Sequence, residues 1–220
     1  MRLILIPGFG EDSQIFSKIL PFLDHPTLLI NLWDNLETAR PLSAKAMAIK
    51  LIETYGLQST DVIIGHSMGG WIGLHIKESI HCLLVHVSSW TDPAKVKLPI
   101  QNKSILYWLT RNGWYINRLT RSLILHRYYK NLPSKGIMEY TLNHLIRQDR
   151  KQVEAQLRLI LEPVSPCLTE PDLRIHTQRD PIVGKPDQEF YLVPGDHFAI
   201  YTFPEDVAKG ISTLLFKGLL

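Results

Sequence analysis

The stretch Asp61-Val62-Ile63-Ile64-Gly65-His66-Ser67-Met68-Gly69-Gly70 decides how the whole chain folds. Its first part is a short apolar run rich in β-branched residues, which is typical of a strand buried on both faces. A helical pattern over 67–79 follows directly, so the serine falls in a tight turn between a strand and a helix. Glycine is needed two residues to either side, because side chains there would collide with neighbouring backbone. The stretch therefore predicts a strand–turn–helix unit with Ser67 in a strained turn.

The same alternation of apolar runs and helical patterns extends over the first 90 residues and returns near the end of the chain. We expect strands at 2–6, 27–32, 61–64, 82–88, 173–177 and 189–193. We expect helices at 13–23, 43–55 and 67–79 and a last one from about Pro204, with Ser13 and Ser43 as N-caps and Gly56 as a C-cap. Repeated strand–helix units imply an α/β fold with a doubly wound, mostly parallel six-stranded sheet.

Residues 91–165 interrupt this alternation, because their pattern is helical only. We expect helices at about 102–111, 114–129, 134–147 and 149–161, with prolines between them. The segment holds 13 Lys and Arg against 5 Asp and Glu, although the formal net charge of the chain is only +3. Such a surface is either a set of solvated helix faces or a site for an acidic partner. We interpret 91–165 as a helical lid inserted into a single domain that comprises residues 1–220.

Composition excludes several classes of protein. A chain of 220 residues, 45% hydrophobic and 20% charged, is typical of one globular domain rather than of a disordered chain or a coiled coil. No apolar run approaches the roughly 20 residues of a membrane-spanning helix, and residues 2–6 fit a first strand better than a secretion signal. No nucleic-acid-binding motif is present. Two cysteines, Cys82 and Cys167, predict free thiols and a cytoplasmic protein.

A serine in such a turn becomes a nucleophile only with a base and an acid that orients the base. Of nine histidines, His197 is the candidate base, because it lies in a loop directly after the last expected strand. Asp180, just after the fifth strand, is the favoured acid. Asp92, after the fourth strand, competes with it, and Asp187 and Asp196 are weaker candidates.

The loop Pro7-Gly8-Phe9-Gly10 follows the first strand and completes the candidate site. In a doubly wound sheet, the first and third strands are neighbours where the winding reverses, and ligands bind at their carboxyl ends. The backbone N–H groups of Phe9 and Met68 are then the expected substrate-binding donors for an oxyanion. We expect no metal or organic cofactor, and no Cys/His cluster to hold one.

Together these motifs resemble those of the α/β-hydrolase fold, in particular small lid-bearing carboxylesterases and pimeloyl-carrier-protein methyl esterases. The resemblance covers essentially the whole chain, through Gly8-Phe9-Gly10, Gly65 to Gly70, Asp180-Pro181-Ile182-Val183 and Gly195-Asp196-His197-Phe198. It implies that Ser67 is the nucleophile, Asp180 the acid and His197 the base. Two features depart from the family. Pro7 replaces the usual histidine before the glycine, and the leading antiparallel hairpin of the sheet is missing.

The sequence therefore predicts a serine hydrolase that cleaves a carboxylic ester or thioester through an acyl-enzyme intermediate. Alternatives that keep the same residues are a receptor-like binding protein with little turnover, a lyase and a cofactor-free peroxidase. The expected partner is a small acyl ester or thioester, with an acidic or carrier-bound substrate as one option, and not a nucleic acid or a membrane; the sequence does not indicate an oligomeric state. The lid would supply aromatic residues (Trp108, Trp114, Tyr115, Tyr128, Tyr129) and cations (Arg111, Arg118, Arg121, Arg127, Lys130).

Overall fold

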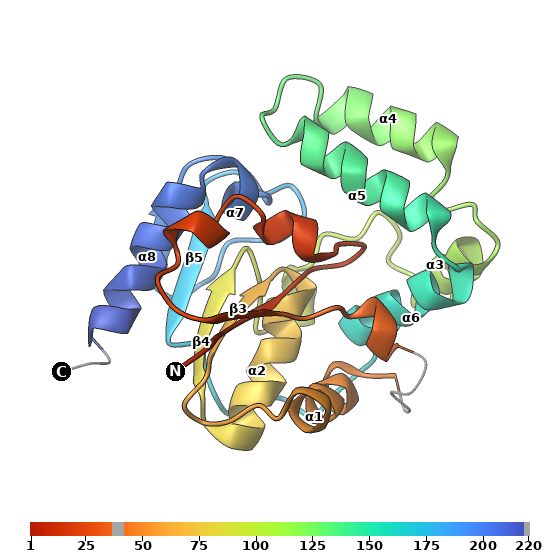
Figure 1. Ribbon diagram of the computed structural model, residues 1–220. Coiled ribbons are helices and arrows are strands. Elements are labelled where there is room, and N and C mark those ends of the chain that lie inside the picture. Colours follow the sequence, from red (N-terminus) through yellow and green to blue (C-terminus); the bar gives the residue numbers. More distant parts are fainter. Residues whose placement is uncertain (37–41, 218–220) are drawn as a thin grey trace.

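A six-stranded sheet forms the centre of the computed structural model, which describes residues 1–36 and 42–217 (Figure 1). Its strands are β1 (Leu3–Ile6), β2 (Thr27–Leu29), β3 (Val62–His66), β4 (Leu83–Val87), β5 (Leu173–Thr177) and β6 (Tyr191–Val193). They lie in the order β2-β1-β3-β4-β5-β6, and every neighbouring pair is parallel. The expected doubly wound α/β sheet is confirmed.

The winding of the sheet reverses at β1, which lies between β2 and β3. Ile6 at the end of β1 pairs with Gly65 near the end of β3. The loop after β1 and the turn after β3 therefore meet at one edge. This edge is the place where sheets of this kind bind ligands.

Helices cover the sheet on both sides, because right-handed crossovers put successive connections on opposite faces where the winding reverses. On one side α1 (Ala44–Tyr55) and α2 (Met68–Ile80) pack against each other. The last helix, α8 (Pro204–Lys217), contacts β5 and β6 and follows the short α7 (Ala199–Thr202). As expected, the Ser43 side chain caps α1 and Gly56 ends it, with a φ of 56°.

Segment 13–23 differs from the helix that the sequence predicts. It forms two short 3-10 turns, Ser13–Phe16 and Leu20–Phe22, and Asp12 rather than Ser13 caps the first of them. Pro21 stands where a continuous helix would need a backbone N–H donor, so the helix cannot run through.

The outer strands are shorter than the apolar runs that encode them. β2 and β6 have three residues each, where the sequence predicts 27–32 and 189–193. Both lie at an edge of the sheet and have only one neighbouring strand to pair with.

Four helices fill the chain between β4 and β5 and are called here the four-helix segment. They are α3 (Lys103–Arg111), α4 (Arg118–Tyr128), α5 (Lys135–Arg147) and α6 (Arg150–Leu161). α3 packs on α6, α4 packs on α5, and α6 also reaches α1 and α2. Figure 1 shows α4 and α5 side by side beyond the sheet. α4 begins later than predicted, because Asn117 and Thr120 form a capping box there.

Within the described ranges, no helix combines the length and the apolar composition that crossing a lipid bilayer requires.

Candidate active site

Ser67 occupies the sharp turn between β3 and α2 with a backbone φ of 52° and ψ of −122°. This conformation is strained for a residue other than glycine and persists only where the surroundings enforce it. A Cβ on Gly65 would lie 2.3 Å from the Cα of Gly70, and one on Gly69 would lie 2.0 Å from the carbonyl oxygen of Ile6. The glycines of the motif are therefore required by close backbone contacts, as the sequence predicts.

Asp180 and His197 meet just after β5 and β6. The His197 Nδ1 lies 2.8 Å from Oδ2 of Asp180, and the backbone N–H groups of Ile182 and Val183 donate to the other carboxylate oxygen. Burial opposes ionisation of Asp180, but the charge and hydrogen bond of His197, with both N–H groups, hold the pKa of Asp180 below its ordinary value. The Asp180 carboxylate therefore holds the His197 ring by Nδ1, so Nε2 is the ring nitrogen that is left to accept a proton.

The three competing carboxylates have other partners. Asp92 is exposed and caps a short turn, and Asp187 pairs with a lysine at the surface. Asp196 is buried, but it accepts a hydrogen bond from the Ser134 hydroxyl. Of the four candidates, only Asp180 is bonded to the His197 ring.

Ser67 and His197 line one cavity of about 630 Å³. In the part of the chain that the structure describes, no hydrogen bond joins the Ser67 hydroxyl to the His197 ring. Such bonds are often long without substrate and tighten in the complex. The structure therefore joins the candidate acid and base and brings the serine to the same cavity.

The two predicted oxyanion donors also lie at this place. Phe9 lines the cavity, and Met68 is the first residue of α2, where a backbone N–H has no intrahelical acceptor. Neither N–H donates to another group among residues 1–36 and 42–217. A Cβ on Gly8 would lie only 2.9 Å from that of Ser67, so the loop passes directly over the serine. Both donors are free to bind a ligand.

Solved structures of similar shape show which fold the chain has. An enol-lactonase from Burkholderia xenovorans LB400 has a TM-score of 0.74 at 12% identity, covering 98% of this chain and 91% of that one. A thermophilic esterase from Thermogutta terrifontis has a TM-score of 0.71 at 19% sequence identity, and the match covers 99% of this chain and 90% of the esterase. A peroxisomal alpha-beta-hydrolase from Saccharomyces cerevisiae has a TM-score of 0.62 at 17% sequence identity, and the match covers 99% of this chain and 77% of that protein. The chain has the α/β-hydrolase fold. No family model and no curated protein matches its sequence.

Side chains of the four-helix segment hold the Gly8–Glu11 loop. The Gly10 N–H donates to Oε1 of Gln156 from α6 at 2.8 Å. The Gly10 carbonyl oxygen accepts from Nδ1 of His144 in α5 at 3.0 Å. The Gly8 N–H donates to the Glu11 carboxylate at 2.6 Å. The loop that carries a predicted oxyanion donor is therefore fixed by two helices from outside the sheet.

A buried pair, Glu11 and His66, joins this loop to the segments that carry the serine and the base. His66 Nδ1 lies 2.8 Å from Glu11 Oε2, and its Nε2 lies 2.9 Å from the carbonyl oxygen of His197. A carbonyl oxygen only accepts, so Nε2 carries a proton while Nδ1 faces a carboxylate. Burial disfavours the charged ring, but the charge and hydrogen bond of Glu11 raise the pKa of His66 above its ordinary value. The sequence analysis assigns no role to either residue.

The cavity is mainly apolar. Of the five aromatic residues expected at the lid, Trp108 is exposed outside the cavity, and the other four line it. Among its described lining residues the one lysine or arginine is Lys97, whose Nζ donates to the Asp180 carbonyl oxygen at 2.6 Å. The five cations that the sequence places on the lid lie elsewhere: Arg111, Arg118, Arg121, Arg127 and Lys130. The cavity therefore suits an apolar group, and an acidic partner would meet those cations outside it.

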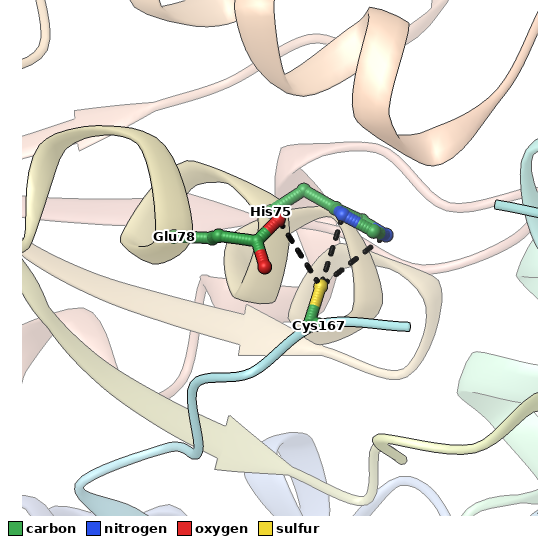
Figure 2. Close-up of side chains that lie close together, drawn as sticks. All are labelled: His75, Glu78 and Cys167. Carbon is green, nitrogen blue, oxygen red and sulfur yellow. Dashed lines mark hydrogen bonds between the residues drawn. The ribbon is translucent and has the colours of Figure 1, made fainter. Parts of the chain in front are cut away.

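The expectation that no Cys/His cluster is present is wrong. Cys167, His75 and Glu78 lie close together (Figure 2). None of the three lines the cavity. Cys167 is 92 positions from His75 in sequence, so no spacing rule for metal sites applies to the pair. The fold alone brings them together.

Proposed function

We propose that this α/β-hydrolase is a serine hydrolase that cleaves a carboxylic ester or thioester with an apolar acyl group. The observation that carries this proposal is the Asp180–His197 pair at the cavity that also holds the strained Ser67. Solved structures of similar shape are named as an esterase and an enol-lactonase, which supports ester chemistry.

In the proposed reaction, the Ser67 hydroxyl attacks the acyl carbon and passes its proton to Nε2 of His197. Asp180 keeps the proton on Nδ1 and stabilises the imidazolium. The Phe9 and Met68 N–H groups stabilise the oxyanion of the tetrahedral intermediate. His197 then protonates the leaving alcohol or thiol, and water that it deprotonates releases the acid from the acyl-enzyme.

One alternative has an observation of its own. Within the described residues, Ser67 and His197 are not hydrogen-bonded, and a binding protein with little turnover that keeps the apolar cavity would need no such bond. The lyase and cofactor-free peroxidase alternatives use the same groups.

A fluorophosphonate probe followed by mass-spectrometric mapping tests the proposal, together with hydrolysis of short-chain p-nitrophenyl esters. We expect the probe to modify Ser67 and the esters to be cleaved. An inert protein that still binds acyl ligands would favour the binding alternative, and a label on another residue would refute the assigned nucleophile.

The shape of the cavity predicts a dependence on acyl length. Each CH₂ buried in the cavity stabilises the bound acyl group by about 0.8 kcal/mol, so kcat/KM should rise up to about fourfold per carbon until the cavity is full. Ile124→Trp should shift the optimum to shorter chains, because Ile124 lines the cavity. Leu119→Trp on the same helix is the matched control, since Leu119 is 83% exposed. A series of p-nitrophenyl esters measures this, and equal rates at all lengths would contradict it.

Glu11→Gln should lower kcat by about 100-fold and change KM little. The substitution keeps the shape of the side chain but removes the charge that holds His66 and the loop of Phe9, and loss of an oxyanion donor has an effect of about this size. Steady-state kinetics measure it, with the exposed Glu53→Gln as the control. Combining Glu11→Gln with His66→Gln should add little, because the two side chains act as one unit. Unchanged kcat in Glu11→Gln would refute the positioning role.

The pH dependence of stability gives a second test of the Glu11–His66 pair. Because the pKa of His66 is raised in the folded state, its contribution to stability is full below its ordinary pKa. That contribution is lost as the pH rises through the folded-state pKa. The difference in Tm between the wild type and Glu11→Gln should therefore be largest in mildly acidic buffer and shrink at higher pH.

A further inference from the structure

The cluster of His75, Glu78 and Cys167 lies apart from the proposed ester chemistry. His75 and Glu78 are one turn apart on α2, and Cys167 lies in the segment 162–172 between α6 and β5 (Figure 2). His75 follows Ser67 by eight positions, which is about 12 Å along a helix. None of the three lines the cavity.

The distances among the donor atoms fit a single small cation. One donor atom of each residue lies within 4.8 Å of the others. The Cys167 Sγ is 3.1 Å from His75 Nδ1 and 3.7 Å from Glu78 Oε2. Sulfur and nitrogen ligands of a tetrahedral zinc ion, at about 2.3 and 2.0 Å from the metal, lie about 3.5 Å apart. The Cys167 sulfur and the His75 nitrogen would have to separate by about half an ångström, and the His75 and Glu78 donor atoms, which lie within 4.8 Å of each other, would have to approach to about 3.3 Å.

Neighbouring groups orient the donors without using the atoms that would face the ion. The Trp71 ring packs edge-on against His75 at 4.7 Å. The Leu168 N–H donates to Oε1 of Glu78, which leaves Oε2 on the side of the thiol. Contacts of this kind hold the ligands of metal sites in place.

The His75 ring has no competing hydrogen-bond partner among the described residues. In residues 1–36 and 42–217, the His75 ring nitrogens hydrogen-bond to Cys167 alone. His75 is buried, whereas Glu78 and Cys167 are half-buried, so solvent reaches two of the three side chains. In the proposed site, water from this side is the fourth ligand. A thiolate, an imidazole and a carboxylate together favour Zn²⁺ over Mg²⁺ or Ca²⁺, which prefer oxygen ligands.

We propose that His75, Glu78 and Cys167 bind one Zn²⁺ ion that ties segment 162–172 to α2. This segment connects the four-helix segment to β5, so the ion stabilises the junction between those helices and the sheet. Zn²⁺ takes the place of the thiol proton, which goes to solvent. The ion takes no part in ester cleavage.

Titration of the chelator-treated full chain with Zn²⁺, in competition with a chromophoric chelator, tests the proposal. We expect one ion per chain. At Zn²⁺ about 100-fold above the Kd, Tm should rise by roughly 5–10 °C. Co²⁺ should bind in the same place and give the near-ultraviolet absorption of a thiolate–cobalt bond.

Two variants remove ligands and two serve as comparisons. Cys167→Ser should weaken Zn²⁺ binding by at least about 100-fold and abolish the thiolate–cobalt absorption, and Glu78→Gln should weaken binding less. Cys82→Ala removes the other thiol, which is buried, and should change neither the Zn²⁺ affinity nor the thiolate–cobalt absorption. Lys45→Ala removes a cation that would repel the ion but also favours the Cys167 thiolate, so it should change the affinity by less than about tenfold.

The outcomes separate the site from the proposed function. Ester hydrolysis should be the same in all four variants and with or without Zn²⁺, so failure of either proposal leaves the other standing. Equal Zn²⁺ affinity in the wild type and Cys167→Ser would overturn the site. So would a wild-type Tm that Zn²⁺ does not change, and the three groups would then form only a hydrogen-bonded cluster.

Discussion

Ser67→Ala should lower kcat/KM for p-nitrophenyl esters by about 10⁶-fold, because it removes the proposed nucleophile and leaves only the oxyanion donors and binding. Labelling by a fluorophosphonate should disappear with it. The exposed Ser104→Ala in α3 is the matched control and should keep both properties. Residual activity within about tenfold of the wild type would mean that another group attacks the ester.

The same position tests the strain of the turn. Alanine keeps a side chain at a φ of 52°, whereas glycine adopts such a conformation without steric cost. Ser67→Gly should therefore be more stable than Ser67→Ala by about 1 kcal/mol, although both are inactive. Denaturant unfolding of the two variants measures the difference, and a less stable glycine variant would argue against strain at this position.

Asp180→Asn should lower kcat/KM by about 10⁴-fold. An amide keeps the shape of the carboxylate, but it neither holds the required tautomer of His197 nor stabilises the imidazolium. Ester hydrolysis near neutral pH measures the effect. Asp187→Asn is the control, because Asp187 lies in the same stretch of sequence but at the surface.

Stability should respond to pH in the direction set by the lowered pKa of Asp180. A carboxylate with a depressed pKa contributes stability above its ordinary pKa and loses it as the pH falls through the folded-state value. The wild type should exceed Asp180→Asn in Tm near neutral pH, and the difference should close in acid. A difference that widens in acid would show that the carboxylate is not held in its charged form.

The candidate catalytic residues could be predicted because each lies just beyond a strand. In a parallel sheet the carboxyl ends of the strands share one edge, so Ser67, Asp180 and His197 could be placed together from their strands. The Gly-x-Ser-x-Gly motif also has a local steric reason that the contacts of Gly65 and Gly69 bear out.

Other features depend on contacts between distant segments and leave no local pattern. Glu11 and His66 are 55 positions apart, and the only sign of their pairing is one acidic residue in an apolar, glycine-rich loop. The helical pattern of 13–23 predicts one continuous helix, and Pro21 is the one local sign of the break that the structure shows.

The hydrogen bonds of Gly10 to His144 and Gln156 make α5 and α6 part of the proposed active site. A displacement of α5 or α6 by a few ångströms would break these hydrogen bonds and free the Gly8–Glu11 loop after β1. We therefore expect that replacing the four-helix segment by helices of another protein would change turnover as well as substrate selectivity. The exception is a replacement that supplies an acceptor for the Gly10 N–H and a donor for the Gly10 carbonyl oxygen.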